Sequence, residues 1–118
     1  MRIDSPFADY PDAWIELPDR WLGRHATRYA EAIEAGKREK LIGRVLDFSV
    51  SLVLLDNWVL PGLTGPPDKW DFQQLPLEII EWVAQTVLLA FNAVRIIPKN
   101  SSPLSPSGLA TGEAQPGT

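Results

Sequence analysis

The sequence predicts an all-α fold: a small three-helix domain with an N-terminal Pro-rich extended arm and a disordered C-terminal tail. A Pro/Gly/Trp-rich connection joins helices 2 and 3. Apolar residues recur three and four positions apart in three segments, which is the period of an amphipathic helix. The 11 prolines lie outside those segments, where they prevent a continuous helix. The predicted boundaries are 1–18 for the arm, 19–97 for the helical domain and 98–118 for the tail.

Composition limits the classes of protein to consider. A chain of 118 residues with 45% hydrophobic content can build the core of one small domain. Its formal net charge of -4 lacks the basic surface of a phosphate-backbone binder, so we expect no nucleic-acid partner. Because the chain contains no cysteine, it can form neither a disulfide nor a thiolate metal site.

The N-terminal arm contains Pro6, Pro11 and Pro18 within its first 20 residues. Proline at this density prevents a helix, and residues 13–17 are expected to form a short extended piece. We expect the arm to lie over the helices, because Trp14 and Ile15 would otherwise be exposed.

The first helix is predicted to begin at Asp19, a favourable N-cap residue. Gly36 is expected to end it, with Lys37, Arg38 and Lys40 near the end, where cations complement the helix dipole. Its apolar face is formed by Leu22, Ala26, Tyr29 and Ile33.

The second helix has the clearest repeat, with spacings of four, three, four, three and four, and Pro61-Gly62 is expected to end it. A buried strand over residues 45–55 is the competing interpretation, because that piece is rich in β-branched residues. The repeat consists of Leu41, Val45, Phe48, Leu52, Leu55 and Val59.

The third helix is predicted to open at Pro76, a residue suited to the first helical turn. So much of its surface is apolar that we expect burial on more than one side, within the domain or against another subunit. One face is formed by Ile79, Val83, Val87, Ala90 and Val94, and further apolar positions are Ile80, Trp82, Leu88 and Phe91. After Ile97 the chain is too rich in proline, serine and glycine to offset the entropy of ordering.

The connection over residues 61–75 and its flanks carry large aromatics that no solvated linker needs. Such side chains each bury roughly 150–250 Å² when they pack, against the chain's own helices or against a partner. The residues predicted to bind a partner are Trp58, Leu60, Leu63, Trp70, Phe72 and Trp82.

No catalytic, cofactor-binding or metal-binding residue is predicted, so the protein is expected not to be an enzyme and to need no cofactor. His25 is the only histidine, and a structural role is the better interpretation. Glu78 and Glu81 lie three apart, but a helix-capping residue and a solvated charge explain them at least as well as catalysis. Residues 82–97 are interrupted by polar side chains, so no membrane partner is expected.

Three stretches resemble the small tail assembly chaperones of long-tailed bacteriophages. They are WIELPDRWLGRHATRYAEA near the N-terminus, the end of the leucine-rich second helix in LLDNWVLPGLTGPP, and KWDFQQLPLEIIEWV, which opens the third helix. The resemblance is one of layout and covers most of residues 13–97. It implies a non-enzymatic protein of the host cytoplasm, absent from the mature virion, that coats the tape-measure protein before the tail tube polymerises.

The resemblance also implies homo-oligomers and contacts with the tail tube protein. Such genes often yield a longer product by ribosomal frameshifting, and Pro98-Lys99-Asn100 can be encoded by CCA AAA AAC, which contains a slippery heptamer. The alternative function is a structural phage head–tail connector or tail-completion subunit, which would also be small, helical and oligomeric.

Overall fold

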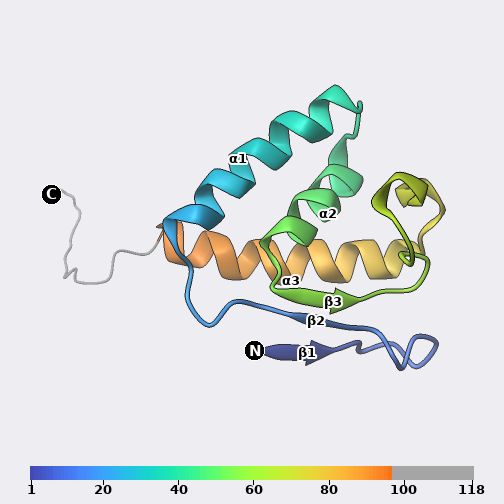
Figure 1. The fold of residues 1–118 in the computed structure, drawn as a ribbon. Helices are drawn as coiled ribbons and strands as arrows, with labels where there is room; N and C mark the ends of the chain where they lie inside the picture. The colour runs from blue at the N-terminus through green and yellow to red at the C-terminus, as the bar shows by residue number, and fades with distance from the viewer. Residues whose placement is uncertain (97–118) are drawn as a thin grey trace, which may run out of the picture.

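The computed structural model of the chain describes residues 1–96, and these form three helices and a small three-stranded antiparallel sheet. Figure 1 shows α3 in the middle, with α1 and α2 on one side and the sheet on the other. The tail predicted for residues 98–118 lies outside the described residues. The helices are α1 (Gly23–Arg38), α2 (Gly43–Leu54) and α3 (Leu77–Ile96), and the strands are β1 (Arg2–Asp4), β2 (Trp14–Glu16) and β3 (Asn57–Val59).

The three predicted helices are confirmed, but the fold is not purely all-α, because the N-terminal arm contributes two strands to a small sheet. The extended piece expected over residues 13–17 is confirmed as β2, the central strand in the order β1-β2-β3. Ile3, Ile15 and Trp58 lie opposite one another across the three strands. Ile15 is fully buried, while its neighbours in β2 are half-buried. The sheet therefore covers the helices with one face, as expected of the arm.

Helix α1 begins four residues later than predicted, at Gly23, so the assignment of Asp19 as the N-cap is wrong. The Asp19 carboxylate instead lies 3.5 Å from the Met1 amino nitrogen. The Leu22 N–H donates to Nδ1 of His25 at 2.9 Å. The His25 imidazole therefore accepts a backbone N–H at the start of α1, as a polar capping side chain usually does.

Gly36 does not end α1, as the sequence led us to expect, but lies buried inside it. A side chain at Gly36 would collide with the Leu46 side chain, so glycine lets α1 approach α2 closely. The helix ends at Arg38, and the Lys40 and Leu41 N–H groups donate to the Lys37 and Gly36 carbonyls. This is a Schellman motif in which Lys40, at φ 63°, holds the left-handed position that glycine usually takes.

Helix α2 confirms the helical interpretation of residues 45–55, and the competing strand is wrong for that piece. The helix ends at Leu54, however, so the repeat was wrong in extending it to Val59. Residues 57–59 form β3, and the Asp56 N–H donates to the Glu16 carbonyl at 2.9 Å. The spacing of four between Leu55 and Val59 fits a helix only by chance. Residues 57–59 pair with a distant strand, and such pairing cannot be recognised from a local repeat.

The connection after β3 folds into two short 3₁₀ helices, η1 (Pro67–Lys69) and η2 (Phe72–Gln74). Gly62 and Gly65 have φ values of 81° and 77°, a backbone conformation that glycine favours and that is typical of turns. The Asp71 carboxylate accepts from the Gln73 N–H at 3.0 Å and caps η2. The segment is therefore structured along its length and is held against the domain.

Helix α3 follows Pro76 as predicted and forms the centre of the core. Ala90 is only half-buried and Val94 is exposed, so the predicted face was wrong at its C-terminal end. Burial instead centres on a face shifted toward Ile80 and Phe91. Among residues 77–94 of α3, the buried ones are Ile79, Ile80, Val83, Ala84, Val87 and Phe91.

One stretch of α3, Leu77–Val94, has the length and the mean hydropathy, 1.4, of a membrane-spanning helix. In this structure 33% of the residues in that stretch are buried, and these residues pack into the domain's core. The core helix of a soluble protein has the same composition, so the absence of a membrane partner stays a prediction.

Replacing Gly36 with valine is expected to destabilise the fold by about 1–3 kcal/mol, because the new side chain must displace Leu46 at the α1–α2 crossing. Thermal unfolding followed by circular dichroism measures the change. Gly23→Val is the matched control, since a side chain there meets no atom within 4 Å. Equal melting temperatures for the two variants would contradict this account of the crossing.

Candidate partner-binding surfaces

The six residues predicted to bind a partner all belong to the hydrophobic core or pack against it. Leu60 and Leu63 are buried in the core, while Trp58, Trp70, Phe72 and Trp82 are half-buried and pack against it. Much of their surface is thus covered by the chain itself. Partner binding by these residues stays a prediction.

The aromatic rings of this set contact one another and the neighbouring elements. The Trp58 and Trp70 centroids are 5.4 Å apart, and Trp70 lies 6.3 Å from Phe72. Phe72 packs edge-on against Phe48 of α2, at 5.4 Å. These separations lie within the range of favourable ring pairs, so the rings fasten the connection to the domain.

The Trp70 indole nitrogen is buried, and within the described part of the chain it has no hydrogen-bond partner. A buried N–H without an acceptor costs about 1–3 kcal/mol, so packing of the ring must outweigh that cost.

The Trp82 ring contacts the N-terminal arm. Phe7 of the arm packs edge-on against it, with ring centroids 6.3 Å apart. The arm and the connection therefore flank the first half of α3.

A second surface, which the sequence did not single out, is a groove along α3 that is bordered by α1 in one part and by α2 in the other. It consists of two hollows of about 430 and 460 Å³ that share Tyr29. We call it the α1–α3 groove. The first hollow is lined by Ala26, Tyr29, Ala30, Ile33, Glu34 and Phe91, and the second by Tyr29, Arg44, Asp47, Ala84, Gln85, Leu88, Leu89 and Asn92.

The groove combines a first hollow with a largely apolar lining and a second hollow with a mainly polar lining. The Tyr29 and Phe91 rings pack with centroids 5.2 Å apart where the two helices meet. Leu89 is 64% exposed although it lies in the middle of α3. At the α2 end, Arg44 donates to Glu81 at 3.0 Å and to Asp47 at 3.3 Å. Sequence reasoning missed the groove because it depends on the angle between α1 and α3, although Leu89 lay outside the predicted buried face.

The titratable residues considered for chemistry do not converge on one point. Glu81 is held by Arg44, whereas Glu78 acts electrostatically on Tyr10 of the arm. Partial burial raises the pKa of the Tyr10 hydroxyl, and the negative charges of Glu78 and Asp9 raise it further. Among the described residues, no group of three or more histidine, aspartate or glutamate side chains is placed to hold a metal ion.

His25 is buried against the Trp21 ring, 5.2 Å away, and accepts the Leu22 N–H through Nδ1. Its proton is therefore on Nε2, which is buried and has no hydrogen-bond partner among the described residues. An imidazole in this position supports the start of α1. The geometry thus agrees with the structural role expected of this histidine.

Comparison of the chain with family models, with curated proteins and with solved structures found no match.

Trp70→Ala is expected to destabilise the domain by about 2 kcal/mol or more, because it removes the ring that joins Trp58 to Phe72. Trp70→Phe is expected to cost less, since it keeps a ring and removes the unpartnered N–H. Urea unfolding followed by circular dichroism measures both. Wild-type stability in the alanine variant would show that the ring does not support the fold.

Proposed function

We propose that this protein is a non-enzymatic phage tail assembly chaperone, which binds the tape-measure protein in the host cytoplasm during tail morphogenesis. The observation that carries the proposal is the α1–α3 groove, which joins a largely apolar hollow at Ile33 and Phe91 to a more polar hollow with Leu89 exposed at its edge. Exposed apolar surface of this kind on a soluble domain marks a site for another polypeptide.

The shape of the groove favours a helical ligand. Ala26 and Ala30 are exposed one turn apart on α1, and small side chains let another helix approach closely. An amphipathic helix laid in a groove places apolar residues at intervals of three and four against such a lining. A long apolar tape-measure protein offers many segments of this pattern, so one chain would accept several of them.

The energetic gain comes mostly from burial. Covering a leucine side chain as exposed as Leu89 contributes roughly 1.5–3 kcal/mol. The ion pairs of Arg44 at the end of the groove are half exposed, so they contribute little to affinity. Recognition by shape and apolarity, with few fixed charges, suits a chaperone that coats successive segments of one long protein.

The resemblance of the three sequence stretches to tail assembly chaperones supports the same function and adds the tail tube protein as a second partner. A protein that leaves before the tube is complete is absent from the mature virion. The frameshift hypothesis belongs to this proposal, because a longer product would extend the chain beyond Ile97 and leave the helices intact. Sequencing the codons for residues 98–100 decides whether the slippery heptamer is there.

Leu89→Glu is expected to weaken binding to the tape-measure protein of the same phage by about tenfold or more, since it places a charge in the groove. Affinity is measured by co-expression, co-purification and titration of the purified pair. Leu77→Glu is the matched control, because Leu77 is a leucine of the same helix with the same exposure, 65% against 64%, and lies outside the groove.

Equal loss of binding in both leucine variants would show that the groove is not the binding site for the tape-measure protein. Failure of the wild-type chain to co-purify with the tape-measure protein would remove the chaperone function itself.

The alternative function, a head–tail connector or tail-completion subunit, makes a different prediction about particles. Mass spectrometry of purified virions is expected to detect none of this chain if it is a chaperone, and a fixed number of copies if it is a connector. The major tail tube protein in the same preparation is the internal control. A stoichiometric amount of this chain in purified particles would contradict the chaperone function and support the connector function.

A further inference from the structure

We infer that strand β1 is an interface between two copies of this chain, which pair edge to edge in antiparallel register about a two-fold axis at Ile3. In this arrangement Ile3 faces Ile3 of the second copy, and Arg2 of each copy lies opposite Asp4 of the other. The inference does not rest on the proposed function. It names a specific contact for the homo-oligomer that the resemblance implies.

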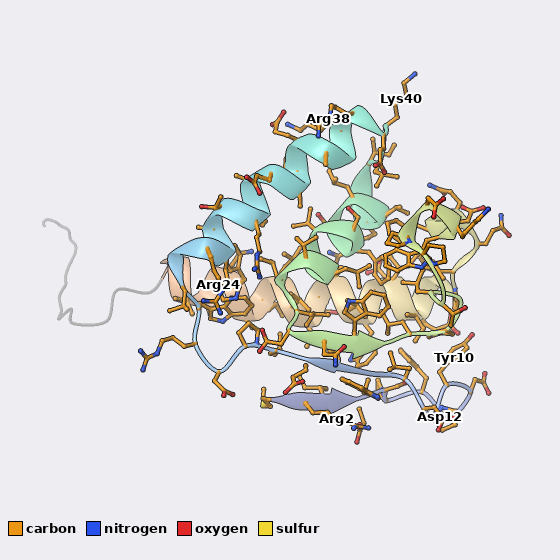
Figure 2. All side chains as sticks on the ribbon, viewed as in Figure 1. Arg2, Tyr10, Asp12, Arg24, Arg38 and Lys40 are labelled. Atoms are coloured by element: carbon orange, nitrogen blue, oxygen red, sulfur yellow. The ribbon has the colours of Figure 1, made fainter. Side chains whose placement is uncertain are left out.

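The edge of the sheet is open on the side that this pairing needs. Figure 1 shows β1 as the outermost strand, with β2 on one side and no described element on the other. Figure 2 shows Arg2 on this strand, on the side of the molecule away from the helices. Unpaired strand edges of this kind are templates for pairing with another chain.

The hydrogen-bond pattern fixes which backbone groups face outward. Met1 and Leu17 exchange two bonds of 2.8 Å, and the Ser5 N–H donates to the Ala13 carbonyl at 2.9 Å. Hydrogen-bonded residues alternate along an antiparallel pair, so Ile3 is the bonded residue between them. The N–H and C=O groups of Arg2 and Asp4 therefore point away from β2. Two copies in the proposed register would exchange four backbone hydrogen bonds through these residues.

Only this antiparallel register places Arg2 of each copy opposite Asp4 of the other copy, so that opposite charges meet twice. Arg2 and Asp4 lie on the same face, where the Arg2 guanidinium bonds its own Asp4 at 3.0 Å and lies 4.5 Å from the centre of the Trp14 ring. Both side chains are largely exposed. An antiparallel two-fold axis at Ile3 places a positive charge opposite a negative one twice. A parallel pairing in register would place like charges side by side.

Charged residues on an edge strand also serve to repel other chains, and that is the competing explanation. Repulsion works best with charges of one sign, because a second identical edge then meets like charges. The edge here alternates in sign, so a second copy in antiparallel register is attracted. The sign pattern, rather than the presence of charge, favours an interface.

The interface is small, with three residues from each copy and apolar contact from Ile3 and the exposed Met1. Contacts below about 1,000 Å² are typical of weak or transient association, so we expect a dissociation constant that is roughly micromolar or weaker. Such a dimer forms at high local concentration, as when several copies lie along one long partner.

Charge reversal provides the test, in the full-length chain by sedimentation velocity over a range of concentrations. Arg2→Glu and Asp4→Lys each place like charges opposite one another, and each is expected to weaken dimerisation by about tenfold or more. The double variant R2E/D4K restores opposite charges in every pair and is expected to dimerise like the wild type. A mixture of the two single variants is expected to form the mixed dimer.

Arg24→Glu makes the same change in net charge as Arg2→Glu at an exposed residue of α1, outside the sheet, and is the matched control for that variant. It is expected to leave dimerisation unchanged. Circular dichroism confirms that each variant is folded. A wild-type chain that stays monomeric at millimolar concentration would overturn the inference, and so would single variants that dimerise like the wild type or a double variant that does not.

Discussion

The pairing of β2 with β3 is the constraint on which the rest of the structure depends. It joins the N-terminal arm to the segment just after α2, with Ile15 opposite Trp58. Once β3 is held there, α2 must stop at Leu54 and the chain must leave along the sheet toward the connection. The buried Ile15 side chain then closes the core from the side opposite to α2. Without this pairing, α3 would be covered on one side only.

The helices could be predicted from the sequence because their information is local. The start of α3 directly after Pro76 and the helical character of residues 45–54 follow from proline chemistry and from spacing. The sheet could not be predicted in the same way, since each strand has three residues and its partner is distant in sequence. The ends of α1 failed for another reason. His25 supplies the capping acceptor that we expected from Asp19, and Lys40 holds the left-handed C-terminal position that glycine usually takes, so neither residue is of the statistically favoured type.

The candidate surfaces show the same division between local and long-range information. The aromatic residues of the connection could be recognised from composition, and the structure places all six against the core, which composition does not reveal. The groove depends on where Tyr29 meets Phe91, and no motif encodes the angle between two helices. The charge pattern of the proposed interface is present in the sequence as Arg2-Ile3-Asp4. It indicates an interface only once β1 is known to be the outer strand of the sheet.

The two proposed contacts lie on opposite sides of α3, and this arrangement has a functional consequence. Figure 1 places α1 and α2, which line the groove, on one side of α3, and the sheet with its outer strand β1 on the other. A copy that pairs through β1 therefore keeps its groove free, and two paired copies present two grooves. When both grooves bind segments of one long protein, the second binding step becomes intramolecular and the overall affinity exceeds that of either groove. A weak strand contact and a modest apolar groove can then combine into stable coating of a long chain, and the coat remains reversible because each contact is weak alone.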